Sequence, residues 1–169
     1  ACILHWTRND GALKRGDMLL LDAGVEGNSL YTADITRTLP ISGKFTEEQR
    51  VIYDLVHRSQ VAAIEAVKPG NDFMEPNRVA MKILTEGLFD LGILKASPEE
   101  ALDKEKQLYR RYSLHNVSHM LGLDVHDALA RLRQVAWTIP IASRPHRAEL
   151  RWAQRVDFVS TNVRPLRFG

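Results

Sequence analysis

Apolar and polar residues follow two patterns along the chain, and the first predicts a pair of strands. The segment LLLDAGVE (19–26) is an apolar run that closes on a carboxylate and leads into a glycine. This pattern predicts a buried strand followed by a turn. After GNS (27–29), the segment LYTADITRTLP (30–40) is rich in strand-forming residues and predicts a second strand. Because the connection is short and polar, we expect the two strands to form a hairpin.

The second pattern places apolar residues at helical spacing and begins after the second strand. Thr46 and Gln49 have the spacing of a capping box, which predicts a helix that begins near Thr46. The periodic residues run through VIYDLVHRSQVAAIEAV, and KPG (68–70) is expected to end the helix. His57 falls inside this helix, where we expect a surface or core-edge position rather than a role as a metal ligand.

Beyond residue 70 the pattern predicts a further helix and then a return to strand. Residues 71–94 predict a second amphipathic helix, interrupted at Gly92, and the polar stretch 97–108 predicts a loop with a short helix. Residues 110–125 have mixed apolar character and predict more strand. The order of strands, helices and strand predicts the α+β class.

The composition is that of an ordinary core-forming chain. Its 169 residues suit one domain or a large part of one, with 44% hydrophobic and 26% charged residues. The single cysteine, Cys2, excludes an internal disulfide and favours a reducing compartment, so we expect a cytoplasmic protein. No apolar run approaches the roughly 20 residues that span a bilayer and no signal peptide is visible, so no membrane association is expected. The first residue is Ala1 rather than Met, which indicates a fragment of a longer protein.

The charges are distributed unevenly along the chain. Residues 128–169 contain eight arginines, no lysine and two acidic residues, so they carry a net charge of +6 and the first 127 residues carry −4. Such a tail indicates either contact with nucleic acid or another acidic surface, or a tail unrelated to the rest of the chain. No known nucleic-acid motif supports the first interpretation, so no nucleic acid is expected as a partner.

Two aspartates stand among strand-forming residues, where an ionised side chain is costly to bury. Asp22 closes the apolar part of the first strand, and Asp34 lies within TADITRT in the second. Carboxylates that meet on one face of a hairpin need a cation between them, or one of them must hold a proton. Oxygen ligands suit Mg, Mn or Ca, and an added imidazole shifts the preference toward Mn, Fe, Co or Zn. The alternative is that Asp22 caps a turn and Asp34 pairs with Arg37.

Three histidines lie within twelve positions in HNVSHMLGLDVHDA (115–128): His115, His119 and His126. The last of them precedes Asp127, an adjacency that can orient an imidazole as a donor or base. Each histidine taken singly suits a structural position. Together with the two aspartates, they indicate a metal-dependent hydrolase.

These strings resemble a known family. LLLDAGVE, TADITRTLPISGKFTEEQRVIYDLV, HNVSHMLGLDVHD and the opening CILHWT are similar to the aminopeptidase P and prolidase branch of the pita-bread metallopeptidases. The resemblance covers about residues 2–127 and is strongest to bacterial Xaa-Pro aminopeptidases. It implies a partial pita-bread (creatinase/aminopeptidase) fold, with antiparallel strands and two packed helices.

The resemblance also implies a metal centre. Asp22 would be the bidentate ligand of one metal ion, Asp34 would bridge two ions, and His119 would be the single imidazole ligand. The cofactor would be two divalent metal ions, with Mn the expected metal. Gly24 and Gly122 would let the backbone pass close to this site.

The remaining histidines would serve the substrate. His115 and His126 match pocket histidines that hydrogen-bond the scissile amide and the tetrahedral intermediate, and His5 matches a further histidine near the substrate. The implied reaction is release of the N-terminal residue from peptides with proline at the second position, through attack by a metal-bridged hydroxide. A homo-oligomer is a further expectation.

The family pattern stops after Asp127. The family completes its cage with two glutamates, in a VEPG-like and an RIEDD-like strand, and this sequence contains neither string. The acids that follow, Glu149 and Asp157, and His146 stand in unrelated contexts. We therefore expect residues 1–127 to form a partial metallopeptidase catalytic domain, and 128–169 to form a divergent arginine-rich tail, from either a shifted reading frame or a genuine chimera.

The missing glutamates affect the expected activity. Three of five ligands hold two divalent ions poorly, so weak metal binding and little or no turnover are expected of the chain as written. Two alternatives remain open. One is a non-catalytic pita-bread domain that binds peptides or a protein partner, and the other is a prolidase.

Overall fold

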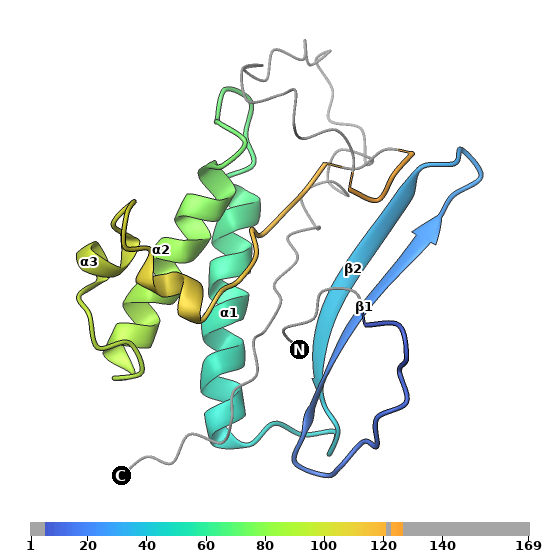
Figure 1. Ribbon diagram of the computed structural model, residues 1–169, viewed down its shortest axis with the longest axis horizontal. Helices are drawn as coiled ribbons and strands as arrows, with labels where there is room; N and C mark the ends of the chain where they lie inside the picture. Colours follow the sequence, from blue (N-terminus) through green and yellow to red (C-terminus); the bar gives the residue numbers. More distant parts are fainter. Residues whose placement is uncertain (1–5, 121–122, 127–169) are drawn as a thin grey trace.

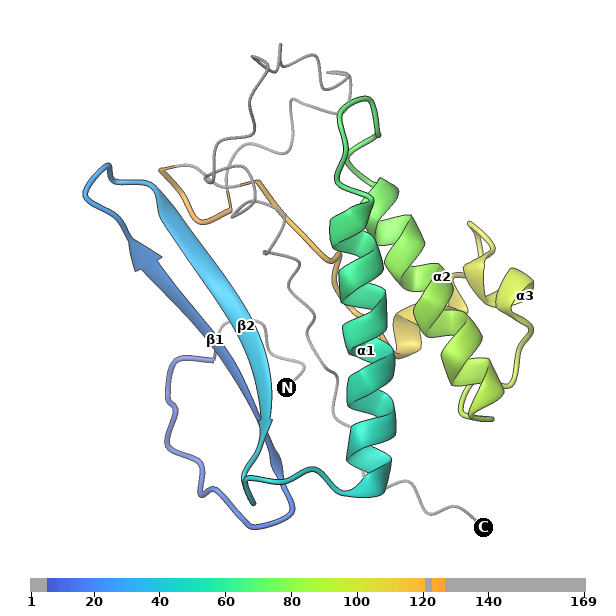
Figure 2. The ribbon, with the colours of Figure 1, turned by 180° about the vertical axis from the view of Figure 1, so that it is seen from behind.

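The computed structural model describes residues 6–120 and 123–126 of the chain. Two strands come first, β1 (Met18–Glu26) and β2 (Thr32–Pro40). Two long helices follow, α1 (Glu47–Glu65) and α2 (Glu75–Asp90), and then the short helix α3 (Pro98–Leu102) and a 3₁₀ turn, η1 (Leu108–Arg111). The hairpin stands on one side and the helices on the other, and the segment after η1 crosses from the helices to the hairpin (Figures 1 and 2).

The hairpin is a two-stranded antiparallel sheet in which Asp22 lies opposite Thr36 and Gly24 lies opposite Asp34. Residues opposite each other, and residues two apart on one strand, share a face, so both aspartates lie on the same face. The opposite face carries exposed apolar side chains: Leu21, Val25, Ile35 and Leu39. The hairpin is thus confirmed, but the expected burial of its first strand is wrong from Leu21 onward, because β2 is the main described element that packs against β1.

Helix α1 begins with the predicted capping box. The backbone N–H of Gln49 donates to Thr46 Oγ1 (3.2 Å), and the backbone N–H of Thr46 donates to Gln49 Oε1 (3.0 Å). The amide of Gln49 also donates to the carbonyl of Gly16 (3.0 Å), which ties the helix to the loop before β1. The helix ends at Glu65, slightly before the predicted KPG stop.

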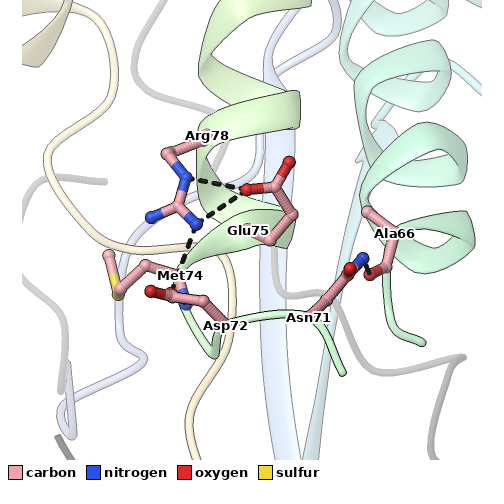
Figure 3. A network of polar contacts seen from close by, with 6 residues as sticks. All are labelled: Ala66, Asn71, Asp72, Met74, Glu75 and Arg78. Atoms are coloured by element: carbon pink, nitrogen blue, oxygen red, sulfur yellow. Dashed lines mark hydrogen bonds and ion pairs between the residues drawn. The ribbon is translucent and has the colours of Figure 1, made fainter. Parts of the chain in front are cut away.

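A polar network joins the end of α1 to the start of α2 (Figure 3). Asn71 Nδ2 donates to the carbonyl of Ala66 (2.8 Å), one of the carbonyls that a helix end leaves without a helical partner. Arg78 pairs with Glu75 (2.7 Å) and Asp72 (3.3 Å). The hydrogen bond to Glu75 raises the pKa of the Arg78 guanidinium. These contacts set the tight reversal that packs the two helices side by side.

The core lies between α1 and α2. Leu55 contributes from α1, and a Cβ added at Gly87 of α2 would lie 2.8 Å from Leu55 Cδ2 and closer still to Cδ1. An alanine at this position would therefore require the Leu55 side chain to move. The buried apolar residues of this core are Leu55, Ala63, Ala80, Met81, Leu84 and Val117. Within the described part of the chain, no helix is long and apolar enough to cross a membrane.

The return to strand predicted for residues 110–125 is wrong for the described part of that segment. It contains η1 and an isolated bridge residue at Met120, but no strand. The reason is that Val117 is drawn into the helical core, where it is 2% exposed, so side-chain anchors rather than a backbone ladder hold the segment.

Candidate metal centre

The histidine-bearing segment is fastened to the helices before it reaches the hairpin. Tyr112 donates its hydroxyl to the carbonyl of Ile93 (3.0 Å), and the backbone N–H of Val117 donates to Asn77 Oδ1 on α2 (3.3 Å). Val117 is also a core residue, so both its backbone and its side chain hold this part of the segment against the helices. The residues that follow extend from this anchor to β2.

The segment meets β2 at Asp34. His119 Nε2 lies 3.1 Å from Asp34 Oδ1, and these side chains are only 18% and 14% exposed. The ring of His126 lies against that of His119, with centroids 4.4 Å apart and planes at 75°. One ligand atom from each of Asp34, His119 and His126 lies within 4.8 Å of the others. Residues 85 positions apart in the sequence therefore form one cluster.

The surroundings of His119 require a proton or a metal ion between it and Asp34. Its Nδ1 lies 2.9 Å from the carbonyl oxygen of Met120, which only accepts, so Nδ1 donates to that oxygen. Nε2 faces a carboxylate oxygen, which also only accepts, so either a proton on Nε2 or a metal ion must stand between these two atoms. An imidazole that donates one N–H to a backbone carbonyl and offers its other nitrogen is the usual arrangement of a metal-binding histidine.

The distances fit a shared ion. Nitrogen and oxygen ligands lie about 2.1 Å from an ion such as Zn²⁺, so neighbouring ligand atoms are roughly 3.0–3.4 Å apart. The 3.1 Å between His119 Nε2 and Asp34 Oδ1 falls in this range. The nitrogen of His126 is within 4.8 Å of the other two ligand atoms, and its side chain is exposed. The described residues therefore fit one metal ion.

Asp22 stands beside this cluster without joining it. It shares the face of Asp34 and is displaced from it diagonally, and it is exposed to solvent. The alternative roles for the two aspartates do not match the structure. Asp22 lies in the middle of β1 rather than at a turn, and Arg37 donates to the carbonyl of Thr36 (2.7 Å) while Asp34 meets His119.

Gly24 lies opposite Asp34 in the hairpin, where a side chain would press on β2. A Cβ added at Gly24 would lie 2.9 Å from the carbonyl oxygen of Ala33 and 3.5 Å from the Cβ of Asp34. The expected close passage of the backbone at this glycine is therefore confirmed. Gly122, its expected counterpart, lies outside the described residues.

Of the other predicted site residues, the structure describes His115 but not His5. His115 is partly buried, and its Nε2 is a buried atom that has no hydrogen-bond partner among the residues that the structure describes. A buried nitrogen of this kind is suited to form a hydrogen bond with a bound ligand. His5, and the tail with Glu149, Asp157 and His146, lie outside the described residues. Sequence reasoning missed Asn77, because an asparagine on an amphipathic helix gives no signal that it will anchor a distant loop.

Residues 1–150 match the sequence pattern of metallopeptidase family M24. The chain belongs to this family. It is similar to an Xaa-Pro aminopeptidase of Streptomyces coelicolor, with 50% identity over 130 residues, which are 77% of this chain and 26% of that protein. It is likewise 50% identical over 127 residues to the Xaa-Pro aminopeptidase of Haemophilus influenzae, which are 75% of this chain and 29% of that protein. As an M24 chain, it spans less than a third of the length of these relatives.

Solved structures agree with this family assignment. Escherichia coli aminopeptidase P in complex with substrate matches with a TM-score of 0.69 and 43% identity, over 75% of this chain and 28% of that one. A Zn-substituted form of the same enzyme, in complex with product, matches equally well. The expected fold is confirmed: this M24 chain contains part of the pita-bread fold. The predicted domain boundary at residue 127 remains a prediction.

Proposed function

We propose that this M24 chain carries part of the catalytic domain of an Xaa-Pro aminopeptidase, which releases the N-terminal residue from peptides with proline at the second position. The observation that carries the proposal is the meeting of Asp34 with His119, at a distance and with a hydrogen-bond pattern that suit a metal ion. The identity to Xaa-Pro aminopeptidases supports the substrate class.

The residues of this chain would act around the metal. A divalent ion, when bound, polarises the scissile carbonyl and supplies a nucleophilic water at neutral pH. Asp34 and His119 would hold it, and Asp22 would add a carboxylate on the same face. His115, whose Nε2 is a buried atom, would donate to the scissile amide or to the oxygen that becomes charged during the reaction. His5 would contact the substrate, as the resemblance implies.

The metal follows from the donor set. A complete site would combine two aspartates, one histidine and further carboxylates, and such oxygen-rich sets suit Mn²⁺. We therefore propose two Mn²⁺ ions for the complete catalytic domain. The residues described in this chain supply ligands for one ion, so the chain by itself would turn over substrate slowly or not at all.

A chimera tests the proposal directly. Residues 2–127 would replace the matching segment of the E. coli Xaa-Pro aminopeptidase, to which the chain is 43% identical over 126 residues. The chimera should release the first residue of an Xaa-Pro tripeptide when Mn²⁺ is added. The same chimera with Asp34→Ala or His119→Ala should be inactive while it remains folded.

The alternatives give different results in the same assay. An inactive but folded chimera that still binds Xaa-Pro peptides would favour a non-catalytic peptide-binding domain and would overturn the proposal. Activity on Xaa-Pro dipeptides without activity on tripeptides would favour a prolidase. The tripeptide and dipeptide assays use the same preparation of the chimera, so a difference in folding between samples cannot explain a difference in activity.

Two further proposals concern the setting of the protein. We propose a cytoplasmic location, because the single Cys2 suits a reducing compartment; fractionation of the source cells tests it. We also propose a homo-oligomer, because the outer face of the hairpin exposes Leu21, Val25, Ile35 and Leu39. Light scattering on the purified chain measures the mass, and a monomer at every concentration would contradict it.

A further inference from the structure

We infer that Asn77 of α2 is a positioning residue of the metal centre, which fixes where His119 meets Asp34 by holding the backbone of Val117. The inference rests on the proposed function, because it takes Asp34 and His119 as metal ligands. It goes further by assigning a role to a helix residue that is not itself a candidate ligand. Asn77 also lies outside the strings that carry the family resemblance.

The contact joins parts of the chain that are 40 positions apart. The backbone N–H of Val117 donates to Asn77 Oδ1 over 3.3 Å. Because a backbone N–H only donates, the atom of the amide that faces it must be the oxygen rather than the nitrogen. Val117 is only 2% exposed, so water would replace a lost acceptor poorly at this donor.

Asn77 stands on a rigid support. Helix α2 also carries Ala80, Met81 and Leu84 of the core between the two long helices, and Ala80 and Met81 are at most 2% exposed. Binding groups supported by helices are held more precisely than groups supported by loops. The helical core therefore sets the position of Asn77 Oδ1, and the hydrogen bond passes that position to Val117.

Val117 lies midway between His115 and His119 in the sequence. Two residues of chain extend at most about 7 Å, so a fixed Val117 limits how far His119 can move. The segment has no strand among the described residues, so no backbone ladder sets its position. The hydroxyl of Tyr112 also ties the segment to the loop after α2, but seven residues before His119. The contact of Asn77 is therefore the anchor that governs His119.

The metal centre depends closely on the position that this anchor sets. His119 Nε2 lies 3.1 Å from Asp34 Oδ1, and ligands must be held within about 0.5 Å of their productive places. Loss of the Asn77 acceptor would release the backbone of Val117 and let His119 shift relative to Asp34. Metal affinity should then fall about tenfold, the lower end of the loss for outer contacts of a site, because Asn77 acts through another residue.

The test uses the whole 169-residue chain, freed of metal by dialysis against a chelator. Zn²⁺ is the probe ion, because imidazole and carboxylate ligands bind it more tightly than Mn²⁺. In calorimetric titration, Asn77→Ala should weaken Zn²⁺ binding about tenfold. Asn77→Asp, which keeps an acceptor oxygen, should restore the affinity to near that of the parent chain.

Asn71→Ala is the matched control. Asn71 is also a partly buried asparagine whose side chain bonds a backbone group, the carbonyl of Ala66 (2.8 Å). That bond stays within the turn between α1 and α2, so the control should bind Zn²⁺ like the parent. With Co²⁺ bound, the visible absorption bands should shift in Asn77→Ala, because the ligand geometry has changed, and should stay in place in Asn71→Ala.

The chimera separates positioning from a general loss of stability. In it, Asn77→Ala should raise the Mn²⁺ concentration that gives half-maximal activity about tenfold. At saturating Mn²⁺ the KM for the peptide should stay close to that of the parent chimera, because Asn77 does not belong to the substrate pocket. A variant that was only less stable would lower the amount of active enzyme without changing its Mn²⁺ requirement.

Each outcome distinguishes this inference from the proposed function. If the parent chain binds Zn²⁺ and Asn77→Ala binds it like Asn71→Ala, the inference is wrong and the proposed function stands. Failure of Asn77→Asp to restore affinity would also overturn the inference. Binding of Zn²⁺ that depends on Asn77, together with an inactive chimera, would support the inference and overturn the function. If the chain binds no Zn²⁺, the Mn²⁺ requirement of the chimera decides, and absence of metal from both proteins would overturn both proposals.

Discussion

Replacement of Gly24 by alanine should damage both the hairpin and the metal site. The new Cβ would lie 2.9 Å from the carbonyl oxygen of Ala33, whereas ordinary contacts of a Cβ begin at 3.4 Å. The obstacle is backbone rather than the end of a flexible side chain, so β2 itself must move by about 0.5 Å. Because Asp34 follows Ala33 directly, the ligand moves with it.

The expected cost comes from two opposing effects. Overpacking against a fixed backbone destabilises by about 1–3 kcal/mol. The alanine also restricts the unfolded chain, which returns about 0.4–1 kcal/mol. The net loss should be about 1–2 kcal/mol, which urea denaturation can resolve. A ligand shifted by about 0.5 Å reaches the limit within which a binding constellation must be held, so Zn²⁺ affinity should fall roughly tenfold by calorimetry.

Gly27→Ala in the same hairpin is the matched control. Its Cβ would lie 3.6 Å from the Tyr31 carbonyl oxygen and 3.9 Å from Ser29 Oγ, which are ordinary contacts. This variant should unfold within about 0.5 kcal/mol of the parent and keep its Zn²⁺ affinity. If Gly24→Ala behaves like Gly27→Ala in both measurements, the close approach at Gly24 does not position Asp34, and the reasoning fails.

Three further substitutions test the frame around the site. Gly87→Ala should lower the free energy of unfolding in urea by about 1–3 kcal/mol, because the new Cβ would clash with the side chain of Leu55. The double variant with Leu55→Ala should lose less than the sum of the two single variants. Additive losses would contradict the clash. Thr46→Ala should cost about 1 kcal/mol in thermal denaturation through loss of the helix cap, and Thr46→Ser should not. Asn77→Ala should cost about 1–2 kcal/mol and weaken Zn²⁺ binding, since Asn77 accepts from Val117 beside the histidines; Asn77→Asp, which keeps an acceptor, should retain both.

Local features of the fold were predictable because their causes are local. The capping box at Thr46 depends on side chains within one helical turn, and its predicted partner Gln49 is the observed one. The hairpin depends on a short polar turn between two strand-forming runs. Burial was not predictable in this way: the apolar side chain of Leu21 is exposed because its neighbours, rather than its own segment, decide what covers it.

The site was partly predictable for a similar reason. Motif strings identified Asp34 and His119, and the structure brings them together. The position of His126 beside them depends on where Asn77 and Val117 fasten the segment, which is a tertiary contact between residues 40 positions apart. A resemblance transfers roles by position in a motif, so it could not show which of these side chains lie next to one another.

Charge balance connects the ion count to the missing glutamates. Two divalent ions about 3.5–4 Å apart repel each other strongly and are stable only when carboxylates between and around them offset the charge. The described face of the hairpin carries two carboxylates, Asp22 and Asp34. Their two negative charges balance the charge of one divalent ion. With two divalent ions, an excess of two positive charges would remain. The imidazole of His119 adds a ligand without changing that sum. The chain by itself should therefore stop at one ion, whereas the chimera, in which the E. coli sequence supplies the downstream part, should bind two.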